Sequence, residues 1–166
     1  MESYKKAVGA VNVAMLWIAV VTTVTMSAMV VLQVVFRYII QSSLSFSEEL
    51  ARYMFVWATF TGTAIAYAKR SHVSIEIIVA RMAKPIKKVF IVITNVISSV
   101  FFILIIVYGI QMILRTVDQT SPALGLRMCY VYAAVPLSGI AMLLNCVRNG
   151  YEEFHNPDII KSEGVE

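Results

Sequence analysis

The sequence predicts an all-α integral membrane protein with four transmembrane helices and one amphipathic helix lying in the cytoplasmic interface. Of the 166 residues, 59% are hydrophobic and only 14% are charged, whereas a soluble domain carries about a quarter of charged residues. Four long apolar stretches contain no charged residue, and every Lys, Arg, Asp, Glu and His lies between them or at the ends of the chain. These stretches cover residues 8–36, 53–68, 89–114 and 128–147.

The lengths of these stretches set the expected spans. A hydrocarbon core of about 30 Å takes roughly 20 helical residues to cross. The first and third stretches exceed this length and can tilt, and the fourth just fits. The second covers only about 24 Å at a rise of ~1.5 Å per residue, so we expect its helix to begin near Ser47, with its first turn in the headgroup layer. The predicted spans are about 8–36, 47–68, 86–114 and 128–147.

The basic residues predict the orientation. Lys5 and Lys6 precede the first span, Arg148 and Lys161 follow the last, and further basic residues fill the second connection: Lys69, Arg70, Arg81, Lys84, Lys87 and Lys88. Because cytoplasmic connections are enriched in Lys and Arg, both termini and the second connection are expected in the cytoplasm. We expect one four-helix membrane domain over residues 1–151, followed by a short polar tail over 152–166.

The first connection combines a compact turn with the start of the second helix. Residues 41–43 make the turn, and Ser45 followed by Glu48 matches the Ser-x-x-Glu capping box. Glu48 and Glu49 fall in the first helical turn, where the helix macrodipole favours acidic residues. Arg52 follows Glu48 by four residues, which suits an ion pair. The pattern fits a solvated helix start and a partner-docking surface alike, and both remain open.

The second connection predicts an additional helix over about residues 72–84. Apolar residues at i, i+3, i+4 and i+7 form one face, while charged residues occupy most of the other. Such a helix lies in the membrane interface rather than crossing the bilayer, with its cations toward anionic headgroups. It serves either as a membrane float or as a brace along a partner. Pro85 then suits the first turn of the third span.

Small residues mark possible helix-packing faces. Ala58, Gly62 and Ala66 are spaced at four on the second span, the spacing that lets two membrane helices approach closely. Pro136 is expected to kink the fourth span. Uncharged hydroxyls and amides within the spans usually join helices through hydrogen bonds, and a path for a polar solute is the alternative.

The third connection, residues 115–127, suits a loop packed against protein at the outer face. Ser121-Pro122 stops the preceding helix and favours a turn. Gly125 frees the backbone, and the segment is short and partly apolar.

The sequence does not support an enzymatic function. Cys129 and Cys146 are ~25 Å apart along one helix, too far to form a disulfide, and His72 and His155 lie outside the spans. The sequence offers no cluster of metal ligands and no Gly-rich phosphate loop. The basic residues follow membrane topology rather than a nucleic-acid footprint. Since ion coupling usually requires an ionisable group within the membrane, the charge-free spans favour a subunit, anchor or scaffold without cofactor or metal.

Several motifs in order resemble one family. They are residues 33–38 (Gln-Val-Val-Phe-Arg-Tyr), residues 45–53 (Ser-Phe-Ser-Glu-Glu-Leu-Ala-Arg-Tyr), Gly62, Ala66, residues 72–76 (His-Val-Ser-Ile-Glu), residues 119–126 (Gln-Thr-Ser-Pro-Ala-Leu-Gly-Leu), Tyr132, Pro136 and Gly139. Together these resemble the small, DctQ-like membrane subunit of tripartite ATP-independent periplasmic (TRAP) transporters over nearly the whole chain.

The resemblance implies a function in the bacterial inner membrane. A periplasmic binding protein captures an organic acid, such as a dicarboxylate or a sugar acid, and a large membrane subunit carries it inward on a sodium gradient. The small subunit binds the large one tightly and enlarges its static scaffold, while sodium binds in the large subunit. The alternative is a self-contained, homo-oligomeric small transporter or channel.

The resemblance also implies two protein contact surfaces, in addition to contact with membrane lipids. The large subunit is expected to contact the small-residue face of the second span and the apolar face of the interfacial helix: Ala58, Gly62, Ala66, Ile75, Ile78, Val79 and Met82. The binding protein is expected to dock transiently at the periplasmic face: Arg37, Glu48, Glu49, Arg52, Ser121, Pro122 and Gly125.

Overall fold

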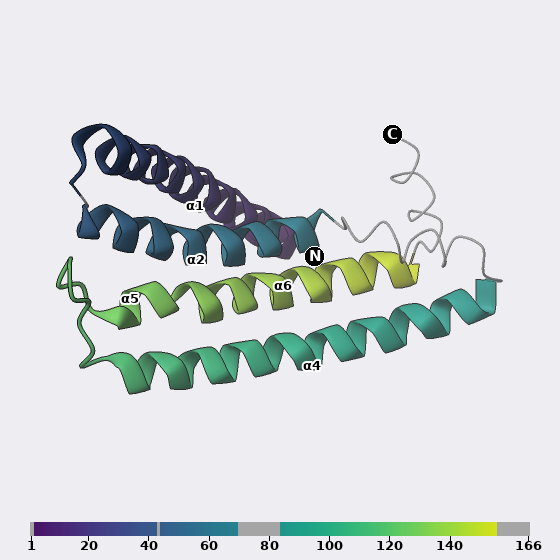
Figure 1. Ribbon diagram of the computed structural model, residues 1–166. Helices are drawn as coiled ribbons and strands as arrows, with labels where there is room; N and C mark the ends of the chain where they lie inside the picture. Colours follow the sequence, from purple (N-terminus) through teal and green to yellow (C-terminus); the bar gives the residue numbers. More distant parts are fainter. Residues whose placement is uncertain (1, 43, 70–83, 156–166) are drawn as a thin grey trace.

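The computed structural model describes residues 2–42, 44–69 and 84–155, and these residues form long helices (Figure 1). In chain order they are α1 (Glu2–Val35), the π-helical turn η1 (Phe36–Ile40), α2 (Ser45–Ala68), α4 (Lys84–Thr116), α5 (Met128–Tyr132) and α6 (Ala134–His155). Within the described ranges, extended pairing is limited to an isolated bridge between Thr120 and Arg127. The all-helical prediction is confirmed for this part of the chain.

The predicted interfacial helix falls mostly on residues that the structure does not describe. Residues 70–83 lie outside the described ranges, and with them Ile75, Ile78, Val79 and Met82. The helix over 72–84 therefore stays a prediction.

Among the described residues, three helical stretches are long and apolar enough to cross a membrane: Tyr4–Ile40, Val89–Thr116 and Met128–Glu152. These match the first, third and fourth predicted spans. Helix α2 is not among the three. Its 24 residues reach about 36 Å at a rise of ~1.5 Å per residue, but its charged start and its threonines make it less apolar. A crossing by α2 therefore stays a prediction, supported by its length.

The observed helices extend beyond the predicted spans at several ends. Helix α1 begins at Glu2 and continues through η1 to Ile40, where Gln41 ends it with a left-handed backbone (φ 57°). Helix α4 begins at Lys84, with Pro85 in its first turn, as predicted. Helix α6 continues to His155, past the predicted end of the domain at residue 151. Polar residues lengthen these helices at their ends, so apolar runs alone underestimate them.

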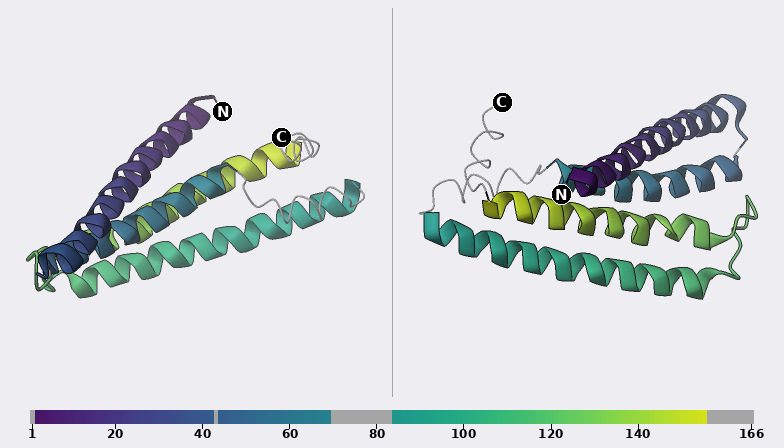
Figure 2. Two further views of the ribbon diagram at one scale, coloured as in Figure 1. Left: turned by 45° about the horizontal axis from the view of Figure 1, so that its top comes forward. Right: turned by 180° about the vertical axis from the view of Figure 1, so that it is seen from behind.

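The helices pack as a row in which α2 and α6 lie between α1 and α4 (Figures 1 and 2). Half of the residues in the apolar stretch of α5 and α6 are buried, against 6% in α1 and 11% in α4. The outer faces of α1 and α4 carry large exposed apolar residues such as Trp17, Val24 and Ile97. Helix α6 therefore forms the centre of the core, and the outer helices present bulky apolar surface.

The predicted capping box at the start of α2 is wrong. The N-cap is Leu44, and Ser45 is already the first helical residue. No described side chain caps the helix at Leu44. In the first turn, the Ser47 hydroxyl donates a hydrogen bond to the Leu44 carbonyl at 2.8 Å. The predicted pairing of Glu48 with Arg52 is confirmed, with 3.1 Å between Oε1 and Nη2.

Glycines set the close approach of α4 to α6. A Cβ atom added at Gly109 would lie 2.9 Å from Cδ of Pro136, and one added at Gly139 would lie 2.9 Å from Cγ1 of Ile106. The helix is interrupted at Ala133. Pro136 explains this interruption, because it has no N–H for the carbonyl four residues earlier. The helix is thus interrupted within one turn of Pro136, while the kink itself stays a prediction. Gly109 and Gly139 leave no room for a larger side chain.

Side-chain amides attach α1 to α6. Asn12 donates from Nδ2 to Oδ1 of Asn145 at 2.9 Å, and Asn145 donates in return at 2.7 Å. Nearer the chain terminus, the Tyr4 hydroxyl donates to the Leu144 carbonyl at 2.8 Å, and Lys5 pairs with Glu152 at 2.9 Å. The beginning of α1 and the end of α6 therefore lie at the same end of the bundle.

Replacing Asn145 with leucine is expected to destabilise the chain by about 1 kcal/mol, the size of a hydrogen bond between membrane helices. Asn145 is fully buried, and its loss leaves the Asn12 amide without its partner. Unfolding by denaturant in detergent micelles measures the effect. The double change Asn12→Leu with Asn145→Leu is expected to cost less than the sum of the single changes, and additive costs would contradict a direct bond.

Candidate functional site

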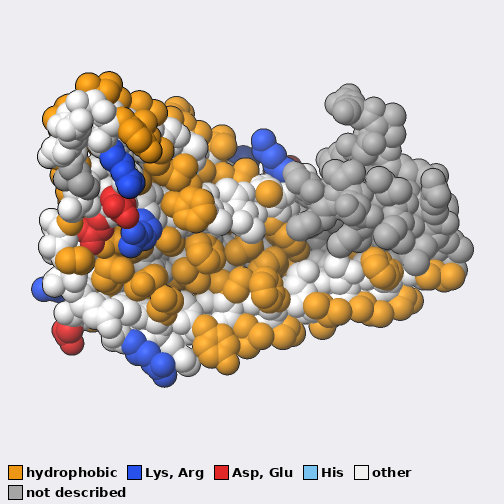
Figure 3. Space-filling view, viewed as in Figure 1, with side chains coloured by type: hydrophobic (Ala, Val, Ile, Leu, Met, Phe, Trp, Pro, Cys, Tyr) orange, Lys and Arg blue, Asp and Glu red, His pale blue; other side chains and the backbone are white. Residues whose placement is uncertain are grey.

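The residues predicted to form the periplasmic face gather at one end of the bundle. This end, named the loop end here, consists of η1, the first turn of α2, the described residues between them, and the loop between α4 and α5 (residues 117–127). Acidic and basic side chains cluster there, while the visible face between the ends is mostly hydrophobic (Figure 3). The loop end is therefore a charged, polar surface and the candidate site for a soluble partner.

Glu49 connects the two parts of the loop end. Its side chain is buried, with only 8% of the residue exposed. Oε2 accepts hydrogen bonds from the backbone amides of Ala123 and Leu124, both at 2.9 Å. Oε1 accepts the hydroxyl of Tyr53 at 2.5 Å. One carboxylate at the start of α2 thus holds a loop more than 70 positions later in the chain.

The loop between α4 and α5 is closed by its own backbone bonds. Ser121 donates to the Leu126 carbonyl at 2.8 Å, Gly125 donates to the Ser121 carbonyl at 3.1 Å, and Met128 donates to the Gln119 carbonyl at 2.9 Å. Gly125 has a positive φ of 64°, which a residue with a Cβ rarely adopts. The predicted turn around Ser121, Pro122 and Gly125 is confirmed, and the loop is held against α2 through Glu49.

The predicted docking residues differ in their exposure. Glu49 and Ser121 are buried, the latter only 4% exposed. Pro122, Gly125 and Arg37 are exposed, as are the paired Glu48 and Arg52. Docking itself stays a prediction, but only the exposed residues can touch a partner directly.

The small-residue face predicted on α2 is not used for close packing within the chain. A Cβ atom added at Gly62 meets no atom within 4 Å. Ala66 is exposed, and Ala58 is half-buried. The hydroxyls of Thr59 and Thr63 on the same outer side donate to carbonyls of α2 itself, both at 2.8 Å. This face therefore carries only short side chains, and the hydroxyls of Thr59 and Thr63 are hydrogen-bonded within the helix.

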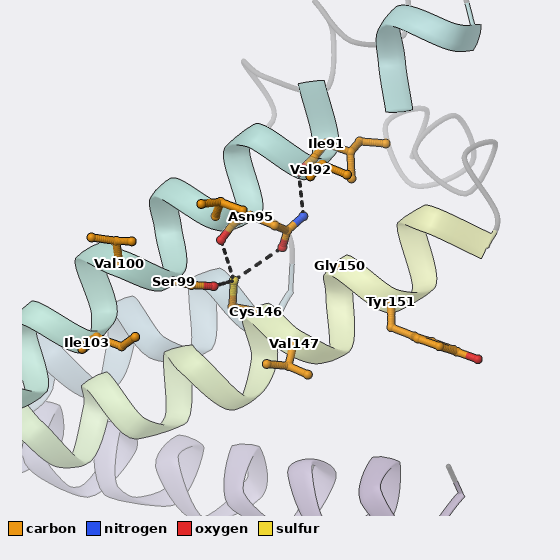
Figure 4. Close-up of a pocket in the computed structure, with 11 residues that line it drawn as sticks. Ile91, Val92, Asn95, Ser99, Val100, Ile103, Cys146, Val147, Gly150 and Tyr151 are labelled. Carbon is orange, nitrogen blue, oxygen red and sulfur yellow. Dashed lines mark hydrogen bonds between the residues drawn. The ribbon is translucent and has the colours of Figure 1, made fainter. Parts of the chain in front are cut away.

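A groove of about 460 Å³ lies between α4 and α6, and Figure 4 shows its polar base. The Cys146 thiol lies 3.3 Å from the Ser99 hydroxyl and 3.4 Å from Oδ1 of Asn95. Asn95 donates to the Ile91 carbonyl at 3.0 Å. The polar atoms at the base thus bond to one another and to backbone, and the remaining lining is mainly aliphatic. Cys146 and Cys129 are both free, as predicted.

The sequence did not predict the roles of three interior polar residues: Asn12, Asn145 and Asn149. The first two pair across helices, and Asn149 donates to the Tyr67 carbonyl of α2 at 3.4 Å. An amide within a long apolar run is itself a signal, because membrane helices bury such groups against one another. Among the described residues, no group of three or more His, Cys, Asp or Glu side chains is placed to hold a metal ion.

Comparison with known proteins gives a family match over most of the chain. The family model described as the DctQ component of tripartite ATP-independent periplasmic transporters matches residues 26–156. Two Haemophilus influenzae proteins, both named putative TRAP transporter small permease protein, are similar to this chain. One is 25% identical over 75% of this chain and 76% of its own length. The other is 30% identical over 69% of this chain and 71% of its own length.

A longer protein also matches. The sialic acid TRAP transporter permease protein SiaT of Haemophilus influenzae is 26% identical over 80% of this chain, but the match covers only 21% of SiaT. In SiaT, a segment similar to this chain is therefore part of a much longer polypeptide.

Proposed function

The chain belongs to the DctQ family, the small permease components of tripartite ATP-independent periplasmic transporters, and from this premise we propose that it braces a large permease subunit in the bacterial inner membrane. The assembled transporter takes up an organic acid that a periplasmic binding protein delivers, driven by a sodium gradient. The observation that carries the proposal is the family match, which runs from the last third of α1 to the end of α6.

The partner in this proposal is a large TRAP membrane subunit held in a tight heterodimer. The similarity to one segment of SiaT supports this pairing, because there a DctQ-like segment shares one chain with a longer permease. A covalent link in one protein favours a lasting contact between the corresponding separate chains in another. The transported acid is selected by the other components of the transporter.

The polar groups of the described bundle support a scaffold role. The apolar stretches of α1, α4 and α6 contain no charged residue, and the amides of Asn12 and Asn145 bond to each other. Ion coupling requires groups that bind and release an ion within the membrane. We place the sodium sites in the large subunit, and this chain needs no cofactor.

The outward face of α2 is the proposed contact with the large subunit. After Phe55 it carries small residues, Thr59, Gly62, Thr63 and Ala66, whereas the outer faces of α1 and α4 are bulky and apolar. Small residues let a second helix approach closely, and bulky aliphatic residues suit lipid chains. Residues 72–84 would add a brace along the same partner at the membrane surface.

The proposed orientation places the loop end in the periplasm and both termini in the cytoplasm. The excess of Lys and Arg in the second connection and at the termini supports this orientation. The ion pair between Lys5 and Glu152 supports it too, because it joins the two terminal helix ends at one side. The binding protein then meets the turn before α2 and the loop between α4 and α5.

Reconstitution tests the proposal. This chain is expected to co-purify in mild detergent with a large TRAP subunit that is co-expressed with it. Proteoliposomes that hold both chains should take up substrate when the binding protein and an inward sodium gradient are present. Omitting this chain should abolish uptake, and full uptake without it would refute the proposal. Liposomes that contain only this chain should show no flux, which separates the scaffold from a self-contained transporter.

A further inference from the structure

The carboxylate of Glu49 accepts hydrogen bonds from three groups at the loop end. Its two oxygens accept bonds from Tyr53 on the same helix and from two successive amides of the distant loop. The Leu124 amide also donates a longer hydrogen bond to the Ser121 hydroxyl at 3.3 Å. Hydrogen bonds to an ionised carboxylate are about twice as strong as bonds between neutral groups. Glu49 therefore fixes the loop against α2.

This arrangement removes Glu49 itself from the docking surface. Burial prevents direct contact with a large soluble partner, unlike at its exposed neighbour Glu48. A charge at the first turn of α2 agrees with the helix macrodipole, but that effect does not require contact with the loop. The loop contact is the feature that distinguishes Glu49 from Glu48.

The loop turns its backbone donors inward and its apolar side chains outward. The amides of Ser121, Ala123, Leu124 and Gly125 are all bonded within the protein, and Pro122 has no amide proton. Pro122 and Ala123 are exposed, and Leu126 is 43% exposed. The exposed surface of the loop thus includes apolar side chains, and the exposed charged pair of Glu48 and Arg52 lies at the same end of the bundle. Its complement is a shallow apolar patch with a polar rim on a soluble protein.

We propose that Glu49 is a positioning residue for docking, which holds residues 121–126 in the one conformation that the periplasmic binding protein recognises. This inference rests on the proposed function. A loop that is ordered before binding loses little conformational entropy when the partner docks. Releasing the loop should therefore weaken docking while the maximal transport rate stays nearly constant.

The test compares variants in proteoliposomes that hold the complete transporter. Glu49→Ala removes all three acceptor contacts, and Glu49→Gln keeps a carbonyl acceptor without the charge. Tyr53→Phe removes only the phenol. Asp118→Ala is the matched control, because it deletes an exposed carboxylate at the same end. The uptake rate is measured against the concentration of binding protein, and hydrogen exchange reports the amides of Ala123 and Leu124.

Glu49→Ala is expected to raise the half-saturating concentration of binding protein about ten-fold or more, the scale of ordering a short loop. Glu49→Gln and Tyr53→Phe should have smaller effects, and Asp118→Ala should have little. Exchange of the two loop amides should accelerate in the same order. If Glu49→Ala lowers the amount of assembled transporter, the test rests on the milder variants. Glu49→Gln and Tyr53→Phe must then raise the half-saturating concentration of binding protein more than Asp118→Ala does.

Two outcomes overturn the inference. Faster amide exchange with an unchanged half-saturating concentration would show that the fixed loop does not serve docking. Unchanged exchange would show that Glu49 does not fix the loop. A failure of the proposed function looks different, because uptake by the wild-type complex would then not depend on this chain at all.

Discussion

Replacing Gly139 with leucine is expected to separate α4 from α6 and to leave little correctly folded chain. A Cβ atom at this position would already lie 2.9 Å from Cγ1 of Ile106 and 3.1 Å from Cγ2 of Ile105. The remaining atoms of leucine have no space unless α4 moves. Overfilling a packed contact usually costs about 1–3 kcal/mol, and the packing of α4 is almost entirely against α5 and α6. Few other contacts can compensate.

The measurement is the fraction of monodisperse protein after purification in detergent, together with its thermal unfolding temperature. Gly9→Leu is the matched control, because a Cβ atom added there meets nothing within 4 Å. Leucine has a higher helix propensity than glycine by up to ~1 kcal/mol, so the control should be neutral or slightly stabilising. Equal behaviour of the two variants would show that α4 and α6 do not depend on this close approach.

Local features of the fold were predictable from the sequence. The apolar runs located the three described helical stretches that suit a membrane crossing, because that suitability depends on length and composition. The spacing of Glu48 and Arg52 predicted their ion pair, and Ser121-Pro122 with Gly125 predicted the turn. Each of these features is decided by residues within a few positions of one another.

Features that depend on helix rotation or on distant partners were not predictable. Which of the two neighbouring acids faces the loop depends on how α2 is rotated, and only Glu49 bonds to Ala123 and Leu124. The predicted capping box failed because α2 begins one residue earlier than the pattern requires. The bond between Asn12 and Asn145 needs α1 to lie beside α6, which no local pattern indicates.

The spacing of small residues also failed to predict which helices approach closely. The sequence singled out Ala58, Gly62 and Ala66 by their spacing, yet among the described glycines the tight contacts are made by Gly109, Gly139 and Gly150. A small residue permits close approach but does not specify which helix approaches. At Gly62 on α2, an added Cβ atom meets no atom within 4 Å in the described structure.

Replacing Gly62 with leucine is expected to abolish or strongly reduce co-purification with the large subunit. The Gly62 position is open in the isolated chain, so the added side chain should not lower the unfolding temperature of this chain alone. In the complex it would project into the contact proposed for the face of Ala58, Gly62 and Ala66. An overpacking cost of about 1–3 kcal/mol corresponds to a roughly 5- to 150-fold loss of affinity, at ~1.4 kcal/mol per factor of ten.

The amount of large subunit retained on the affinity-purified small subunit in mild detergent measures this loss. Ala28→Leu is the matched control, since Ala28 is exposed on α1, whose outer face already carries bulky apolar residues such as Trp17 and Val31. That variant should retain the partner. If Gly62→Leu retains it equally well, the large subunit does not approach α2 through its small residues. The same loss in Gly62→Leu and Ala28→Leu would instead indicate that bulk on either outer helix disturbs insertion into the membrane, rather than one specific contact.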